Sequence, residues 1–240
     1  MQSAVSLFGG MRLVQDDRYH MLGLDTILLS DFATLKRNMR VCDLGAGVGA
    51  LSLLLAGREK TAVIDGLELS PGACALAEEN IKLNGLSDRV FVHPADLRSE
   101  KLPLCAGAYD LIVTNPPYFA RGSGRMPEGD RSLARSEEAC PLSSLLKTAR
   151  RLLKWGGYFS LVYRPERLCE LIVSLSGQRI EPKRLRLVLK DARSAPSLVL
   201  LEGKVGASPG LKILPPLIIK MEAGGDSEEI NRIYQREIPG

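Results

Sequence analysis

The sequence is poor in histidine and aromatic side chains, and its cysteines are well separated. Aromatic residues make up 5% of the 240 residues, with one tryptophan, and His20 and His93 are the two histidines. The five cysteines form no Cys-x-x-Cys pair and stand at Cys42, Cys74, Cys105, Cys140 and Cys169. Because zinc sites and disulfide frameworks need clustered ligands or paired cysteines, this pattern argues against both. We therefore expect a reducing, cytosolic setting and no metal.

Long apolar runs are also missing. No uninterrupted apolar stretch reaches the ~18 residues that a membrane span needs, and no basic region followed by an apolar one opens the chain. With 45% hydrophobic residues the chain can still bury a full core. These features predict a cytoplasmic protein with one main domain and no membrane partner.

The net charge is only +4, but it is unevenly distributed. Residues 1–118 carry 11 basic and 14 acidic groups, residues 119–200 carry 16 and 8, and residues 201–240 carry 5 and 6. The basic excess thus lies in the middle stretch. Such an excess is typical of a surface that meets a polyanion, although an ordinary solvated face has the same composition.

Strand-like and helix-like segments alternate along the chain. A helix should begin near Ser70-Pro71, where serine can cap and proline suits the first turn, and end at Asn84-Gly85. Further helices are expected around 141–154 and 165–177, after a polar loop from about 119 to 140. The strand-like segments are 40–45, 61–68, 89–93, 109–114, 157–163, 184–190 and 197–202. This alternation predicts an α/β fold with a seven-stranded, mainly parallel sheet, a terminal antiparallel strand pair and helices on both faces.

The first predicted strand ends in a glycine-rich turn. It reads Asp43-Leu-Gly45-Ala-Gly47-Val-Gly49 and leads into the apolar run 51–55. Glycines at such a turn permit the close approach of a ligand to bare backbone. A glycine pattern alone is weak, but this spacing differs from the G-x-G-x-x-G of nicotinamide and flavin binders. Asp43, at the strand end, is suited to orient a ligand's ammonium group.

Acidic residues also end the next two predicted strands. Glu68 can accept hydrogen bonds from both ribose hydroxyls of a nucleoside, with Leu69 bordering the adenine. Asp96, followed by Leu97, is suited to accept a hydrogen bond from the adenine's exocyclic amine. Ligands of open α/β sheets bind outside the carboxyl ends of the strands, so these acids and Asp43 should face one crevice. Helix capping or surface solvation is the blander explanation, and it leaves the three successive strand ends unexplained.

The fourth predicted strand is followed by Asn115-Pro116-Pro117-Tyr118, the most specific motif of the chain. An exocyclic amine or amide nitrogen is a poor nucleophile because its lone pair is delocalised. If the Asn115 side-chain oxygen and the Pro116 carbonyl accept its two protons, the nitrogen can pyramidalise and attack a sulfonium methyl group. Tyr118 would stack on the planar target, and Phe119 would extend that wall. Without this context the motif is merely a turn.

Together, residues 40–118 resemble the Rossmann-like class I methyltransferases that carry the signature of N6-adenine and N5-glutamine modification. The resemblance implies catalysis by Asn115, Pro116, Pro117 and Tyr118. It implies S-adenosylmethionine (SAM) as cofactor, held by Asp43, Gly45, Gly47, Gly49, Glu68, Leu69, Asp96, Leu97 and Asn115. The expected organisation is an N-terminal segment packed on the core (1–38), the SAM-dependent methyltransferase domain (39–222) and a C-terminal tail (223–240).

Stretches near both ends look like the bacterial tRNA-Val adenine-N6 methyltransferase family. They are Arg12–Gln15, Gly23–Leu29, Glu181–Val188 and Lys212–Pro216. This similarity implies that the substrate is an anticodon-loop adenine of a tRNA, methylated at its N6 amine. One departure is the histidine that this family often carries after the Pro-Lys-Arg-Leu-Arg strand, where this chain reads Val188-Leu-Lys190. The departure concerns which tRNA is recognised rather than catalysis.

Basic residues beyond the motif are candidates for phosphate contacts with this RNA. Besides Phe119, the candidates are Arg121, Arg125, Arg131 and Arg135 in the polar loop, Arg150 and Arg151 on the next helix, and Lys183, Arg184 and Arg186 on a later strand. A solvated basic face remains the alternative for them.

Other substrates share the signature. A ribosomal RNA base and the glutamine side chain of a protein are the alternative acceptors, although the protein-directed family usually has a helical domain ahead of the cofactor fold, in place of the short segment 1–38. A non-enzymatic alternative is an RNA-binding assembly factor that retains the fold without turnover. The oligomeric state is not predicted.

Overall fold

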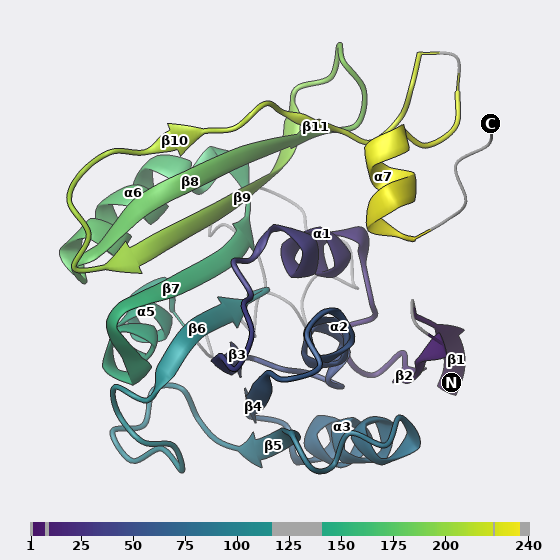
Figure 1. Cartoon of the computed structure of the whole chain (residues 1–240), viewed down its shortest axis with the longest axis vertical. Coiled ribbons are helices and arrows are strands. Elements are labelled where there is room, and N and C mark those ends of the chain that lie inside the picture. The colour runs from purple at the N-terminus through teal and green to yellow at the C-terminus, as the bar shows by residue number, and fades with distance from the viewer. Residues whose placement is uncertain (1, 8–9, 117–140, 223, 236–240) are drawn as a thin grey trace, which may run out of the picture.

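The computed structural model describes residues 2–7, 10–116, 141–222 and 224–235, and its main feature is one twisted sheet (Figure 1). The sheet has nine strands in the order β10-β8-β9-β7-β6-β3-β4-β5, with β11 beside β8. They are β3 (Arg40–Leu44), β4 (Val63–Glu68), β5 (Val90–Pro94), β6 (Tyr109–Thr114), β7 (Leu153–Tyr163), β8 (Ile180–Leu189), β9 (Pro196–Val205), β10 (Lys212–Ile213) and β11 (Leu217–Ile218). The first seven overlap the seven predicted segments, and β10 and β11 are additions of two residues each.

Strand direction follows the prediction. β5, β4, β3, β6 and β7 run parallel to one another, whereas β9 is antiparallel to both β7 and β8. The inner strands are buried on both faces, as the apolar runs Val41-Cys42 and Leu111–Val113 require. The mainly parallel sheet with a terminal antiparallel pair is therefore confirmed.

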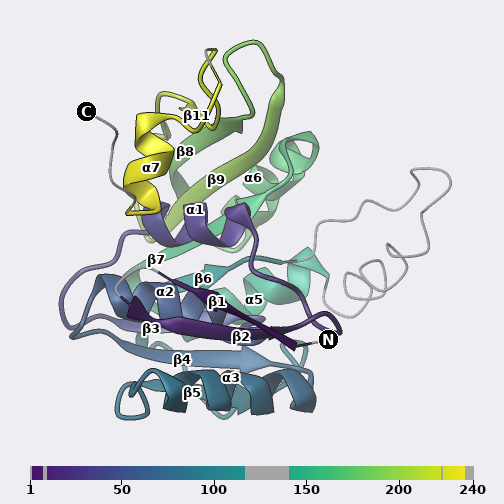
Figure 2. The ribbon, with the colours of Figure 1, turned by 90° about the vertical axis from the view of Figure 1, so that its right-hand side faces the viewer.

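Helices cover both faces of the sheet (Figure 2). They are α1 (Leu24–Phe32), α2 (Ala50–Arg58), α3 (Pro71–Leu83), α5 (Leu142–Leu152), α6 (Leu168–Gly177) and α7 (Glu228–Ile233), with a short 3₁₀ turn, η2 (Pro165–Arg167). One apolar cluster joins α1, α2 and α3 to one face of the sheet, and a second joins α5 and α6 to the other. α3 begins as predicted, because the Ser70 side chain accepts a hydrogen bond from the backbone N–H of Ala73.

The boundary between α5 and β7 differs from the prediction. The sequence predicts a helix to 154 and a strand from 157, but α5 ends at Leu152 and β7 begins at Leu153. The register of β7 on β6 shifts between the pairs Tyr109–Leu153 and Leu111–Tyr158. Gly156 lies inside this bulge with a φ of 78°, a value that glycine adopts without strain. The bulge lets the strand continue through Gly156 and Gly157.

The N-terminal residues form a hairpin that the sequence analysis did not predict. β1 (Gln2–Ser6) pairs antiparallel with β2 (Arg12–Asp16) as a separate sheet. The buried Asn80 of α3 holds it, because its Oδ1 accepts from Val14 N at 2.8 Å and its Nδ2 donates to Val14 O at 2.9 Å. The same Nδ2 donates to Val48 O, so hairpin and glycine turn share one anchor.

The C-terminal part is fastened to β8. The Arg186 guanidinium donates to both carboxylate oxygens of Glu229 at 2.7 Å, which ties α7 to the sheet. Ser227 caps α7 by accepting from Ile230 N, and its hydroxyl donates to Ile218 O. None of the helices in the described part of the chain has the length and apolar character that a membrane crossing requires.

Candidate active site

Four predicted site residues stand at the carboxyl ends of four neighbouring parallel strands. In the sheet order β6-β3-β4-β5, Asn115 follows β6, Asp43 lies at the end of β3, Glu68 ends β4, and Asp96 follows β5. Because the strands are parallel, these ends meet at one edge of the sheet. The structure thus brings the four residues together in a row, with the glycine turn after β3 among them.

Asp43 is a buried acidic residue of β3. Its side chain is 1% exposed, and Oδ2 accepts a hydrogen bond from the Ser52 hydroxyl at 2.8 Å. Oδ1 has no hydrogen-bond partner among the described residues. Burial raises the pKa of Asp43 from 3.8 to about 7, and nearby Glu68 adds to the rise, while the Ser52 hydrogen bonds oppose it. A buried acceptor without a partner is costly, so Oδ1 is placed to receive a donor from outside the chain.

The glycine turn has the shape of a cradle. Gly45, Gly47 and Gly49 all have positive φ, at 77°, 55° and 86°. A Cβ at Gly45 or Gly47 would meet no described atom within 4 Å, so these two glycines border open space, whereas Gly49 packs on Ala77 of α3. The backbone N–H groups of Gly45 and Ala46 are held by the Leu67 carbonyl of β4.

Glu68, at the end of β4, binds two backbone segments of the site. Its Oε2 accepts from Gly47 N at 2.9 Å and its Oε1 from Ser70 N at 2.8 Å, so the carboxylate joins the glycine turn to the start of α3. Leu69 is 51% exposed and borders this carboxylate in the chain. An exposed leucine beside an oriented carboxylate is suited to an apolar ring and a hydroxylated sugar.

Asp96 is engaged differently from the prediction. Its carboxylate accepts from the Arg98 guanidinium at 2.6–3.0 Å and from Arg98 N, and these hydrogen bonds lower its pKa. The predicted acceptance of an adenine amine therefore has to share the carboxylate with Arg98. Leu97 is half-buried, and its carbonyl accepts from the Thr148 hydroxyl of α5 at 2.7 Å.

Asn115 is held by a residue that the sequence analysis did not single out. Its side-chain Nδ2 donates to Oγ1 of Thr26 on α1 at 2.9 Å, across 89 residues of sequence. Pro116 is the last described residue before the gap, and Pro117 and Tyr118 lie outside the described residues.

The sequence analysis also missed Ser52, the partner of Asp43, although a serine within the leucine run 51–55 is a signal of a buried hydrogen bond.

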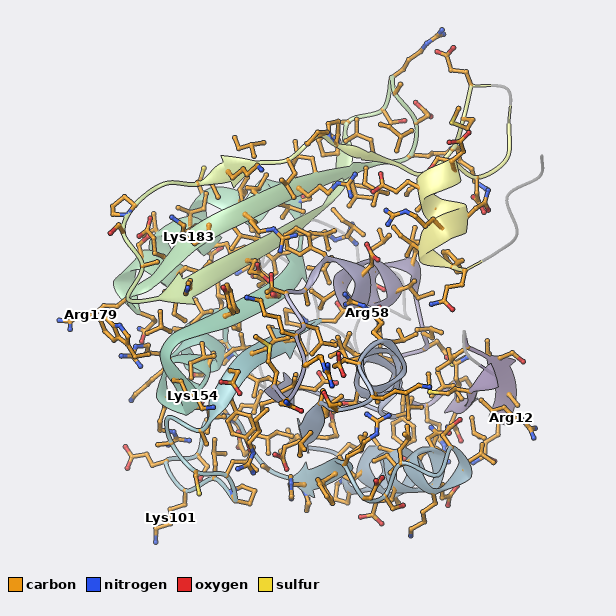
Figure 3. The ribbon with its side chains drawn as sticks, in the orientation of Figure 1. Arg12, Arg58, Lys101, Lys154, Arg179 and Lys183 are labelled. Atoms are coloured by element: carbon orange, nitrogen blue, oxygen red, sulfur yellow. The ribbon has the colours of Figure 1, made fainter. Side chains whose placement is uncertain are left out.

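The RNA candidates divide into two groups. Phe119, Arg121, Arg125, Arg131 and Arg135 lie outside the described residues. Of the others, Lys183 lies on β8 and donates to Ser208 O at 3.0 Å (Figure 3). Arg184 binds the buried Glu202, and Arg186 binds Glu229. These ion pairs within the chain weigh against RNA contacts by Arg184 and Arg186, which stay predictions.

The residues present at the strand ends fit SAM. The orphaned Oδ1 of Asp43 suits an ammonium group, and the open space at Gly45 and Gly47 suits a ligand lying against backbone. Within the part of the chain that the structure describes, no group of three or more histidine, cysteine or acidic side chains is placed to hold a metal ion.

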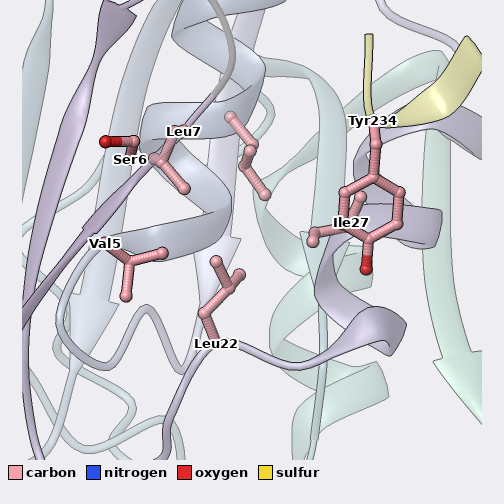
Figure 4. A pocket seen from close by; sticks show the side chains of 7 residues that line it. Val5, Ser6, Leu7, Leu22, Ile27 and Tyr234 are labelled. Carbon is pink, nitrogen blue, oxygen red and sulfur yellow. The ribbon is translucent and has the colours of Figure 1, made fainter. Parts of the chain in front are cut away.

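An apolar cavity lies elsewhere, between the hairpin and the C-terminal helix (Figure 4). It measures about 390 Å³, and its lining residues are Val5, Ser6, Leu7, Leu22, Ile27, Leu54 and Tyr234. None of them belongs to the row at the strand ends.

Comparison with known proteins agrees with this geometry. A family model described as "Methyltransferase small domain" matches residues 24–176. A solved structure of a predicted O-methyltransferase from Agrobacterium tumefaciens superimposes with a TM-score of 0.73, covering 88% of this chain and 96% of that one at 22% identity, a likeness of fold. The geranyl diphosphate C-methyltransferase of Streptomyces coelicolor, solved with S-adenosyl-L-homocysteine, gives a TM-score of 0.54 at 14% identity over 75% of this chain and 78% of that one. The fold is that of the Rossmann-like SAM-dependent methyltransferases.

Curated relatives are more specific. A protein of Parabacteroides distasonis named tRNA1(Val) (adenine(37)-N6)-methyltransferase is 34% identical over 213 residues, 88% of each chain. A protein of the same name from Tolumonas auensis is 36% identical over 191 residues, 78% of each chain. The chain belongs to the methyltransferase small domain family, in the branch of these tRNA1(Val) (adenine(37)-N6)-methyltransferases.

Proposed function

We propose that this protein transfers the methyl group of SAM to the exocyclic N6 amine of an adenine in a tRNA, in the cytoplasm where its substrate is found. The observation that carries the proposal is the row Asn115, Asp43, Glu68 and Asp96 along four adjacent strand ends. The names of the curated relatives supply the acceptor class, an adenine of a tRNA of the valine type.

We assign the amino-acid portion and the ribose of the cofactor to the chain's own residues. Oδ1 of Asp43, which has no partner among the described residues, would receive the ammonium group, and the glycine turn would let the amino-acid portion lie on backbone. Glu68, already oriented by Gly47 N and Ser70 N, retains lone pairs for the ribose hydroxyls. When bound, SAM supplies an electrophilic methyl group on a positively charged sulfur.

The acceptor amine is prepared by Asn115 and Pro116. Nδ2 of Asn115 donates to Thr26, and we assign to its Oδ1, which only accepts hydrogen bonds, the contact with the substrate amine. Oδ1 and the Pro116 carbonyl would each accept a hydrogen bond from one N–H of the amine. The nitrogen can then pyramidalise, and its lone pair is no longer delocalised into the ring. Rate then comes from positioning and from charge stabilisation rather than from a strong base.

The test is methyl transfer from labelled SAM to tRNA isolated from cells lacking the native modification, followed by nucleoside analysis and mapping of the labelled position. We expect N6-methyladenosine in a single tRNA species. Asn115→Ala should lower the rate by about 100-fold or more, as loss of a positioned acceptor does.

The matched control is Asn231→Ala on α7, an asparagine outside the strand-end row. It should keep the wild-type rate. Label in ribosomal RNA or in a protein instead of tRNA would show that tRNA is not the acceptor. SAM binding without transfer to any RNA would indicate an assembly factor on a methyltransferase fold.

A further inference from the structure

The two ends of the Asn115 side-chain amide have nearly the same shape, so a hydrogen-bonding group must hold the amide in one orientation. Oxygen and nitrogen of a carboxamide are nearly equal in size, but one only accepts hydrogen bonds and the other only donates. A flipped amide would aim N–H donors at the donor protons of an amine. A group outside the substrate pocket is therefore needed to hold Nδ2.

Thr26 contacts Nδ2 of Asn115. Its Oγ1 lies 2.9 Å from Asn115 Nδ2, and Thr26 is only 5% exposed. The hydrogen bond is sheltered from water, which strengthens it and makes its loss costly for both partners.

The helix that carries Thr26 is anchored at both ends. Before α1, the Gln15 side chain accepts from Leu22 N at 2.6 Å. After α1, the backbone N–H and hydroxyl of Thr34 donate to the buried Glu202 of β9 at 2.8 and 2.7 Å. The segments that flank α1 are thus tied to β2 and β9, and the contact with Asn115 sets Thr26 relative to the strand end that bears it.

From these contacts we infer that Thr26 is a positioning residue, whose hydroxyl holds the Asn115 amide with Oδ1 turned toward the acceptor amine. The inference deepens the proposed function and rests on it for the identity of the amine. It makes the segment before the cofactor fold a working part of the active site.

The test compares Thr26→Val, which removes the hydroxyl and nearly keeps the shape, with Thr26→Ser, which keeps the hydroxyl. Thr26→Val should lower kcat by about 10- to 100-fold, a loss of the size expected for one buried hydrogen bond, while SAM affinity changes less than about 3-fold. Thr26→Ser should retain most of the rate. Ser30→Ala is the matched control, because Ser30 is a buried hydroxyl of the same helix that donates to Ile27 O.

A double-mutant cycle between Thr26 and Asn115 distinguishes an orienting role of the Thr26 hydroxyl from a role in packing. In the Asn115→Ala background, Thr26→Val should cause no further loss of rate, since the amide to be oriented is gone. Equal losses in Thr26→Val and Thr26→Ser, or full additivity with Asn115→Ala, would overturn the inference.

A readout without any substrate keeps this inference distinct from the proposed function. In protein labelled with ¹⁵N-asparagine, the side-chain resonance absent from Asn115→Ala should move in Thr26→Val and stay in place in Thr26→Ser and Ser30→Ala. A resonance unmoved by Thr26→Val refutes the positioning role. A moved resonance in a protein that methylates no tRNA supports the contact while rejecting the proposed acceptor.

Discussion

The hydroxyl of Ser52 donates to Oδ2 of Asp43 at 2.8 Å and leaves Oδ1 of the same carboxylate buried without a partner among the described residues. The unfolded chain has no such burial. Since the pKa of Asp43 is raised from 3.8 to about 7 in the folded protein, the folded state holds a proton that the unfolded state has lost. The stability that this proton contributes is complete below pH 4 and disappears as pH rises through 7.

We therefore predict that Asp43→Asn flattens the pH dependence of stability. Between pH 4 and 7 the free energy of unfolding of the wild type should fall relative to the variant by up to an amount on the order of 4 kcal/mol. Urea unfolding of both proteins at several pH values measures this difference. The variant should also lose SAM affinity, and parallel pH curves would show that Asp43 is ionised in the folded protein throughout.

Gly47→Ala is expected to weaken cofactor binding more than it weakens the fold. Gly47 has a φ of 55° with open space where a Cβ would point, so alanine should cost about 1–2 kcal/mol in backbone strain and intrude on the ligand's space. Calorimetry should show SAM affinity reduced by about 10-fold, which corresponds to about 1.4 kcal/mol.

Gly85→Ala provides the comparison. Gly85 has a φ of 65° and equally open surroundings, but it ends α3 instead of lining the cradle. It should lose similar stability and bind SAM as the wild type does. Equal SAM affinity of the two variants would show that the glycine turn does not contact the cofactor.

Removal of the Glu202 carboxylate should destabilise the protein strongly. Glu202 is 1% exposed and accepts from Thr34, Ser160 and Arg184, so Glu202→Ala leaves buried donors and a cation without their partner. We expect a loss of about 3–5 kcal/mol in unfolding free energy. Glu222→Ala should change it by less than about 0.5 kcal/mol, because the Glu222–Arg193 pair is 72% and 86% exposed. Comparable losses in the two variants would contradict this reasoning.

Arg186→Ala and Glu229→Ala should have the same effect. Their paired side chains are 16% and 32% exposed, and each variant should lose about 1 kcal/mol, with strong coupling in the double variant. The measurement is a double-mutant cycle by urea unfolding, accompanied by the salt dependence of tRNA binding. If Arg186 instead contacts a phosphate, Arg186→Ala alone should reduce the salt slope by about 1, and Glu229→Ala should not.

The alternation of strands and helices could be predicted because the buried parallel strands contain short apolar runs, which turn or polar residues separate from the helices. Asp43, Glu68 and Asp96 could be assigned to one edge from topology alone, since parallel strands present their carboxyl ends on the same side. The hairpin β1–β2 escaped prediction because Ser3, Ala4 and Gln15 show no clear alternation, and its position depends on Asn80 of a later helix.

The local sequence determined which functional residues stand at the end of each core strand. These are a glycine turn after the first core strand, acids at the ends of three strands, and an asparagine before two prolines. Only the tertiary structure decided which partners those groups have. Thr26 meets Asn115 across 89 residues, and Arg184, a predicted RNA contact, donates to the buried Glu202 of the neighbouring strand. Strand ends follow from local patterns of apolar and turn residues, whereas the partner of a buried polar group depends on how distant elements pack.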